Sequence, residues 1–158
     1  MPVSYPLNTL LTLRQEIKKR CEQRLAEATA ELQAAEENFR HALAQVQTQK
    51  DSIVRVQKEW ATQEPGSIKK LQWQERYLHR LNKILERKSQ GGIEAQIQRD
   101  QQQKVLVIIQ QDLLQAVAAL KAVERNHEIW DQARREKAER RAEQELDDLV
   151  LARQRRPG

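Results

Sequence analysis

Apolar residues recur every three or four positions along the first part of the chain. Two interleaved series each advance by seven residues. The first series is Leu25, Leu32, Phe39, Val46, Ile53 and Trp60, and the second is Ala28, Ala35, Ala42, Gln49 and Val56. A 3-4 apolar repeat sustained over several heptads is typical of a coiled-coil seam. The pattern therefore predicts a long helix over residues 7–63.

Pro65-Gly66 interrupts this repeat, and the residues after it start a second one. We expect a turn at residues 64–67, with Ser67 as the N-cap of the next helix. The repeat resumes with Leu71, Leu78, Leu85, Gly92, Arg99, Leu106, Leu113 and Leu120. The interleaved series is Gln74, Leu81, Lys88, Ala95, Gln102, Ile109, Ala116, Val123 and Trp130. Its phase continues through Gly91-Gly92. We therefore expect one helix over residues 68–155 with a weak point or kink at the glycines, and a break there stays open as an alternative.

A hairpin folded at the turn brings the two repeats together. Pairing residues whose numbers add up to about 131 places Leu25 opposite Leu106, and it places the bulky Phe39 opposite Gly92. The predicted fold class is all-α. We expect a long two-helix antiparallel coiled-coil hairpin that forms a single domain over residues 1–158 and carries a C-terminal helical overhang.

The overhang is predicted from the end of the apolar repeat. In this register Trp130 lies level with residue 1, so residues 131–156 have no partner helix. Between Trp130 and Leu146 the only apolar residues are alanines, although the stretch lacks glycine and proline. A helix that buries so little is marginal in water on its own. We therefore expect this segment to bind another molecule.

Composition and charge narrow the classes of function. The chain has 158 residues, of which 32% are charged, and its net charge of +5 is confined to residues 65–92, because both flanking segments are neutral. A nucleic-acid-binding patch is one reading of such a cluster, and a solvated helix face is the favoured one. The stretch Val105–Leu120 contains Asp112 and is predicted to be too short and too polar to span a bilayer. No signal peptide is expected either.

No pattern of catalytic residues stands out. The three histidines are far apart in sequence, and no glycine-rich phosphate loop is present. The single cysteine, Cys21, lies on the apolar seam and is expected to be a small core residue in a reducing compartment. We therefore expect no enzyme activity, no cofactor, no metal and no small-molecule substrate.

Two regions could be contact surfaces. One is the turn end, where aromatic and basic residues gather: Trp60, Lys69, Trp73, Arg76, Tyr77 and Arg80. Exposed aromatics with basic neighbours favour protein contacts, whereas aromatics folded over the hairpin end are the alternative. The other region combines the N-terminal stretch Tyr5–Leu13 with the overhang, because the closely spaced leucines of that stretch cannot all face one seam.

Two stretches carry a resemblance to a known family. The segment "YPLNTLLTLRQEIKKRCEQRLAEA" (residues 5–28) has an aromatic, a leucine and paired leucines before an arginine, and then a charged coiled coil. The segment "HEIWDQARREKAERRAEQELDDLVL" (residues 127–151) has a histidine and a tryptophan, a dense charge run, an acidic cluster and then small aliphatics. In these features the chain resembles the type III secretion stalk family, the SctO (YscO, CdsO) proteins of injectisomes and FliJ of flagella. The double glycine departs from the uninterrupted helices of that family.

The resemblance implies a function in protein export. Such stalks enter the central pore of the hexameric secretion ATPase and link it to the membrane export gate, and some bind export chaperones. The implied ATPase contacts here are Leu10, Leu13, Arg14, Arg134, Arg135, Lys137, Arg140, Arg141, Leu146 and Leu149. The implied gate or chaperone contacts are the six turn-end residues named above. The implied location is cytoplasmic, peripheral at the inner-membrane secretion apparatus of a virulence-related system, with no insertion into the membrane itself.

Two alternatives stay open at this point. Within the family, the chain could be a flagellar export stalk that escorts chaperones. From another class, it could be a basic coiled-coil nucleic-acid-binding protein that uses Lys69 to Lys88, although nucleic acid is the disfavoured partner.

Overall fold

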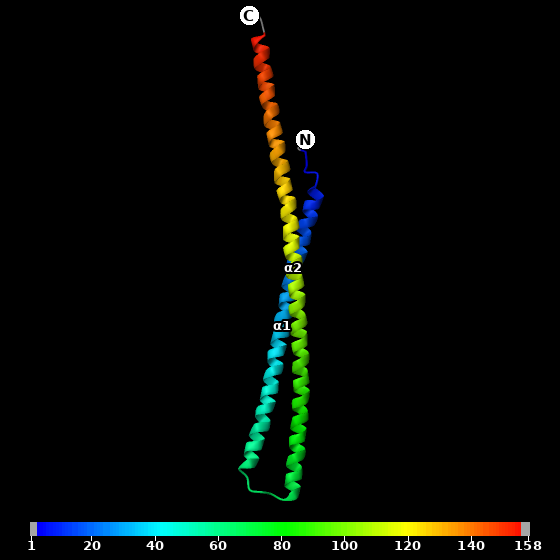
Figure 1. The fold of residues 1–158 in the computed structure, drawn as a ribbon, viewed down its shortest axis with the longest axis vertical. Helices are drawn as coiled ribbons and strands as arrows, with labels where there is room; N and C mark the ends of the chain where they lie inside the picture. Colours follow the sequence, from blue (N-terminus) through cyan, green and yellow to red (C-terminus); the bar gives the residue numbers. More distant parts are fainter. Residues whose placement is uncertain (1–2, 156–158) are drawn as a thin grey trace. The chain divides into compact units, whose positions relative to one another are not determined.

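Two helices and a short connection make up the part of the chain that the structure describes, residues 3–155 of a computed structural model. Helix α1 spans Asn8–Ala61 and helix α2 spans Ile68–Gln154 (Figure 1). No strand occurs within residues 3–155. The prediction of an all-α fold is confirmed, and contacts between the two helices are those of a helical hairpin. The helix bounds differ from the predicted ones by one or two residues, which is the usual uncertainty at helix ends.

Local hydrogen bonds explain where the helices end. At the end of α1 the backbone N–H groups of Thr62 and Gln63 bond to carbonyls three residues back, both at 3.3 Å, which tightens the last turn before Pro65. At the start of α2 the Ser67 hydroxyl accepts a hydrogen bond from the backbone N–H of Lys70 at 3.4 Å. Ser67 is therefore the N-cap of α2, as predicted.

The glycine pair lies inside an uninterrupted helix. Gly91 and Gly92 are both helical, and no glycine within residues 3–155 has a positive φ. The alternative of a break between two helices is therefore wrong. A Cβ added at Gly91 would meet nothing within 4 Å. A Cβ at Gly92 would meet only Val46, whose Cγ2 atom would lie 4.0 Å away.

The predicted packing of Phe39 on Gly92 is wrong. Phe39 instead carries the guanidinium group of Arg99 over its ring, with the Cζ atom 4.5 Å from the ring centroid. A cation is attracted to the face of an aromatic ring. Arg99 can therefore occupy a seam position without being left among purely apolar neighbours. The helices are offset from the predicted register here, because Gly92 lies beside Val46 and Phe39 lies beside Arg99.

Alanine at the two glycines should stabilise the chain. Both positions are helical and have room for a Cβ, so Gly91→Ala with Gly92→Ala should raise the free energy of unfolding by about 0.5–1 kcal/mol per site. Urea unfolding followed by circular dichroism measures this. Gly66→Ala is a control outside the helices, for which no such gain is expected. A lower urea midpoint for the double variant would contradict the observed packing.

The chain divides into two compact units, and the larger unit spans Arg24–Gln110. Its core is built from small and medium side chains, with Ala28, Ala35 and Ile53 among the buried residues. Gln49 is the buried polar residue of this unit, and its Nε2 donates to the backbone carbonyl of Leu81 at 3.1 Å. Burial of the amide is therefore compensated by a hydrogen bond.

The other unit joins the chain up to Gln23 with the chain from Gln111 onward. Its buried residues are Tyr5, Cys21, Ala116, Leu120 and Val123. Cys21 is a buried free cysteine, as predicted. The prediction that residues 1–158 form one domain stays a prediction.

Helix α2 contains an apolar stretch that is mostly outside the core. One 18-residue window in it has a mean hydropathy of 1.5, so by length and composition alone α2 could cross a membrane. Core helices of soluble proteins pass the same test, but only 17% of this window is buried. Val107, Ile108 and Leu114 are at least half exposed. The apolar residues of this stretch are therefore only partly explained by packing against α1.

Candidate functional site: the terminal groove and the turn cluster

Tyr5 anchors the N-terminal segment to α2. Its side chain is only 6% exposed, and its hydroxyl donates a hydrogen bond to the Oδ1 atom of Asn126. The ring meets His127 edge-on at a centroid distance of 4.5 Å and Trp130 at 5.4 Å. Edge-to-face pairs at these distances are favourable beyond their buried area. Tyr5 thus fixes the segment before α1 against one face of α2.

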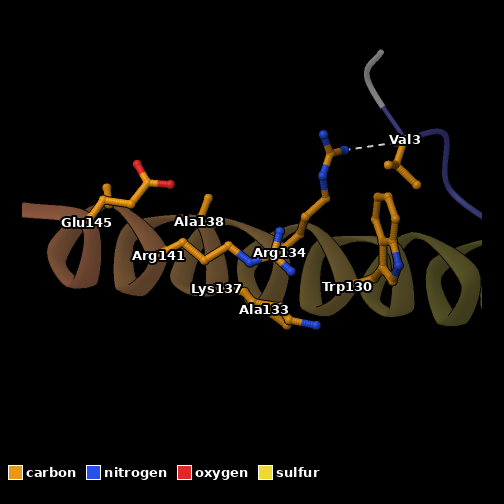
Figure 2. A pocket seen from close by; sticks show the side chains of 9 residues that line it. Val3, Trp130, Ala133, Arg134, Lys137, Ala138, Arg141 and Glu145 are labelled. Carbon is orange, nitrogen blue, oxygen red and sulfur yellow. Dashed lines mark hydrogen bonds between the residues drawn. The ribbon is translucent and has the colours of Figure 1, made fainter. Parts of the chain in front are cut away.

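Arg134 extends this contact by one helical turn. Its Nη1 donates a hydrogen bond to the backbone carbonyl of Val3 at 2.8 Å, and its Cζ lies 5.5 Å from the centroid of Trp130. Figure 2 shows the Arg134 side chain reaching across to Val3, with the Trp130 ring below it. The overhang was predicted to begin at residue 131. In the structure its first turn contacts the N-terminal segment through the hydrogen bond from Arg134 to Val3.

A groove of about 630 Å³ opens along α2 beside this contact. We call it the terminal groove. It is lined by Val3, Trp130, Ala133, Arg134, Lys137, Ala138, Arg141, Ala142 and Glu145 (Figure 2). Three cations, one anion and three alanines thus share one face of the helix. Three of the predicted ATPase contacts, Arg134, Lys137 and Arg141, come together here.

From Gln132 onward the described part of the chain exposes all its side chains. Every residue from Gln132 to Arg155 is exposed, so none of them contributes to the core. Leu146 and Leu149 are each 62% exposed and lie outside the groove. We call residues 132–155 the exposed tail. Residue 156, the last of the predicted overhang, lies outside the described residues.

The other predicted basic contacts of the tail do not line the groove. Arg135 forms an exposed ion pair with Asp131 at 3.1 Å, four residues earlier on the same helix. Exposed pairs of this kind contribute little to stability. Arg140 is exposed as well. Both residues are therefore accessible to another molecule, but they belong to a different part of the helix surface.

The predicted contacts in α1 are accessible to different degrees. Leu13 is 47% exposed, whereas Leu10 and Arg14 are half-buried. The Nε atom of Arg14 is buried without a hydrogen-bond partner. Such an atom is costly unless another group satisfies it. Leu10, Leu13 and Arg14 do not line the terminal groove, so the structure does not join them to the basic residues of the tail.

The aromatic residues at the turn pack on one another. We call Trp60, Trp73 and Tyr77 the turn cluster. Trp73 and Tyr77 stack with a centroid distance of 5.5 Å and an interplanar angle of 10°, and Trp60 lies 6.2 Å from Trp73 and 5.9 Å from Tyr77. Trp60 and Tyr77 are half-buried, while Trp73 stays 60% exposed. The cluster therefore covers the hairpin end and still presents one indole to solvent.

Basic residues surround the turn cluster without partners in it. Lys69, Arg76 and Arg80 are exposed. Within residues 3–155, none of the three side chains forms a hydrogen bond or an ion pair, and none lies over an aromatic ring. The turn cluster thus presents one exposed indole, that of Trp73, beside several exposed basic side chains.

Within residues 3–155 no group of three or more His, Cys, Asp or Glu residues is placed to hold a metal ion. The terminal groove is lined mainly by cations and alanines. Comparison with protein-family models, with curated proteins and with solved structures finds no match to the chain.

Sequence reasoning missed the contact of Tyr5 with Asn126, His127 and Trp130. The signal was present, because the predicted register already placed Tyr5 opposite Asn126. Tyr5 precedes α1, however, and a helical repeat makes no statement about residues outside the helix. The hydrogen bond from Arg134 to Val3 uses a backbone carbonyl, so no side chain in the sequence indicates it.

Proposed function

We propose that this chain is the central stalk of a type III secretion (injectisome) ATPase complex. In this proposal the terminal groove and the exposed tail enter the pore of the hexameric ATPase, and the turn cluster contacts the membrane export gate or an export chaperone. The observation that carries the proposal is the exposed tail. A segment of 24 residues that buries none of its side chains has no role in the core, so binding a partner is the reason to retain it.

The chemistry of the tail suits a pore built from identical subunits. Lys137 and Arg141 lie four residues apart on one face, with Ala138 and Ala142 beside them. Small side chains allow close approach, while the charges make separate contacts that are weak in water. An occupant of this kind can contact several subunits without binding any one of them strongly.

A coiled coil is the packing that we propose for the two helices. Buried positions in the larger unit include Ala28, Ala35 and Gln49, which are separated by seven and fourteen residues. In the smaller unit Ala116 and Val123 are likewise seven residues apart. A seven-residue spacing of buried positions is the pattern of a coiled-coil seam. A coiled coil of this type suits a stalk.

Purification of the full-length chain from its own host tests the proposed function. We expect a hexameric secretion ATPase to copurify, and the purified chain to raise the ATPase rate. Copurification of a flagellar ATPase with chaperones would favour the flagellar alternative. Binding to nucleic acid with a steep dependence on salt, and no ATPase, would contradict the stalk proposal.

Reversing two charges in the groove tests the proposed contact directly. Lys137→Glu with Arg141→Glu should weaken binding to the ATPase by about tenfold or more, because two cations facing the partner become anions. Titration of the ATPase rate with the variant measures this. Lys50→Glu with Arg55→Glu is a matched control, since both residues are exposed on α1 and the change in net charge is the same. Equal loss in both variants would point to net charge and not to the groove.

A further inference from the structure

A second apolar stripe runs along α2 on the side away from α1. Ile93, Ile97 and Ile108 are 52%, 51% and 56% exposed. At about 100° per residue the three isoleucines fall within an arc of about 60°. Gly92 and Ile109, which are buried, lie on an arc centred about 180° away. Helix α2 is therefore apolar on two opposite faces in this region, and only one of them is used within the chain.

One basic residue lies within this stripe, and acidic residues lie along its edges. Lys104 lies in the middle of the arc, between Ile97 and Ile108. Glu94 and Asp100 lie at its edges, and all three side chains are accessible. The Asp100 carboxylate accepts hydrogen bonds from the neighbouring Arg99 through one oxygen, Oδ1, so its other oxygen is free to bind elsewhere.

We infer that this stripe binds a second copy of the chain, in an antiparallel contact between the two α2 helices. A two-fold axis passing between Asp100 and Gln101 places Ile93 of one copy opposite Ile108 of the other. It also places Lys104 opposite Ile97 of the second copy, within one turn of that copy's Glu94 and Asp100. The contact repeats on both sides of the axis. Lys104 of each copy therefore lies near two carboxylates of the other copy.

The charges favour a second copy over a lipid surface. An anionic membrane attracts helices whose apolar face is bordered by lysine and arginine. This stripe is bordered by Glu94 and Asp100 instead, and its single lysine is central. When the stripe faces an antiparallel copy, the lysine of each chain lies near the carboxylates of the other chain, so the charges are complementary. The inference does not depend on the proposed function.

The size of the stripe sets the expected strength of the dimer. Sixteen residues of helix, from Ile93 to Ile108, span about 24 Å. Two helices in contact over this length bury less area than a standard stable interface. We therefore expect a reversible dimer that forms at micromolar concentrations, with monomer present on dilution.

Sedimentation velocity of the full-length chain over a range of concentrations tests this inference. We expect a shift from monomer to dimer, and Ile97→Glu with Ile108→Glu should raise the dissociation constant by about tenfold or more. Leu43→Glu with Val54→Glu is the matched control, because these two α1 residues are 49% and 46% exposed and lie off the stripe. Circular dichroism checks that each variant is helical. A wild-type chain that stays monomeric at all concentrations would overturn the inference.

A charge swap distinguishes this geometry from other modes of association. Lys104→Glu alone should dissociate the dimer, because the introduced carboxylate would meet the second copy's Asp100, and Asp100→Lys alone should do the same. An equimolar mixture of the two variants should dimerise again, since each contact then joins opposite charges. No recovery in the mixture would show that these residues do not face each other. Vesicles of phosphatidylcholine and phosphatidylserine are the second probe: binding lost in the Ile97→Glu, Ile108→Glu variant, together with a monomeric wild type, would assign the stripe to lipid.

Discussion

Truncation after Arg135 should leave the hairpin folded and remove its action on the ATPase. All the residues removed between Glu136 and Arg155 are exposed, so the melting temperature should change by no more than a degree or two. The cut preserves the bond from Arg134 to Val3 and the ion pair of Arg135 with Asp131. Under the proposed function, stimulation of the ATPase and protein export should be abolished.

Two measurements on the truncated chain separate stability from binding. Thermal unfolding by circular dichroism reports whether the hairpin survives, and the ATPase rate with purified hexamer reports the contact. A truncated chain that folds and still activates the ATPase normally would place the pore contact elsewhere. A large fall in melting temperature would mean that the tail packs on the hairpin.

Replacing Tyr5 should loosen the smaller unit without unfolding the larger one. Tyr5→Ala removes a ring that is 6% exposed and contacts both His127 and Trp130, which should cost about 2–4 kcal/mol. Tyr5→Phe removes only the hydrogen bond to Asn126, which should cost about 1–2 kcal/mol. The larger unit has its own buried residues, so the loss should be local.

Hydrogen exchange followed by mass spectrometry measures this effect segment by segment. Protection should fall in residues 8–23 and 111–130 and stay unchanged around the buried Ile53. Trp73→Ala is the control, because Trp73 is 60% exposed although it also stacks in an aromatic cluster. A uniform loss of protection along the whole chain would show that the two units unfold together.

The helices could be predicted from the sequence because their signals are local. The breaker Pro65-Gly66 and the N-cap Ser67 each act within a few residues, and the structure has both as expected. The absence of large apolar side chains between Trp130 and Leu146 likewise predicted the exposed tail.

Contacts between the helices were harder to predict, because they depend on register. Phe39 was placed on Gly92 by the predicted register and by a match in size. A ring face also attracts a guanidinium group, however, and Arg99 occupies it. Arginine is an unfavourable residue at a seam position when only hydrophobic periodicity is considered, so the repeat cannot predict this pairing. The terminal groove escaped prediction for a related reason, since the Val3 carbonyl that helps to form it is a backbone group.

The exposed tail has a thermodynamic consequence for any molecule that binds it. An isolated helix of this length exchanges with non-helical conformations in water, and a partner that recognises the helix binds only the fraction in which it is formed. The apparent affinity is then the intrinsic affinity multiplied by that fraction. Residues outside the groove, such as Glu139 and Glu143, affect the helix propensity of the tail, and they therefore influence the strength of binding without making a contact. Affinity in such a system can evolve at positions that the partner never touches.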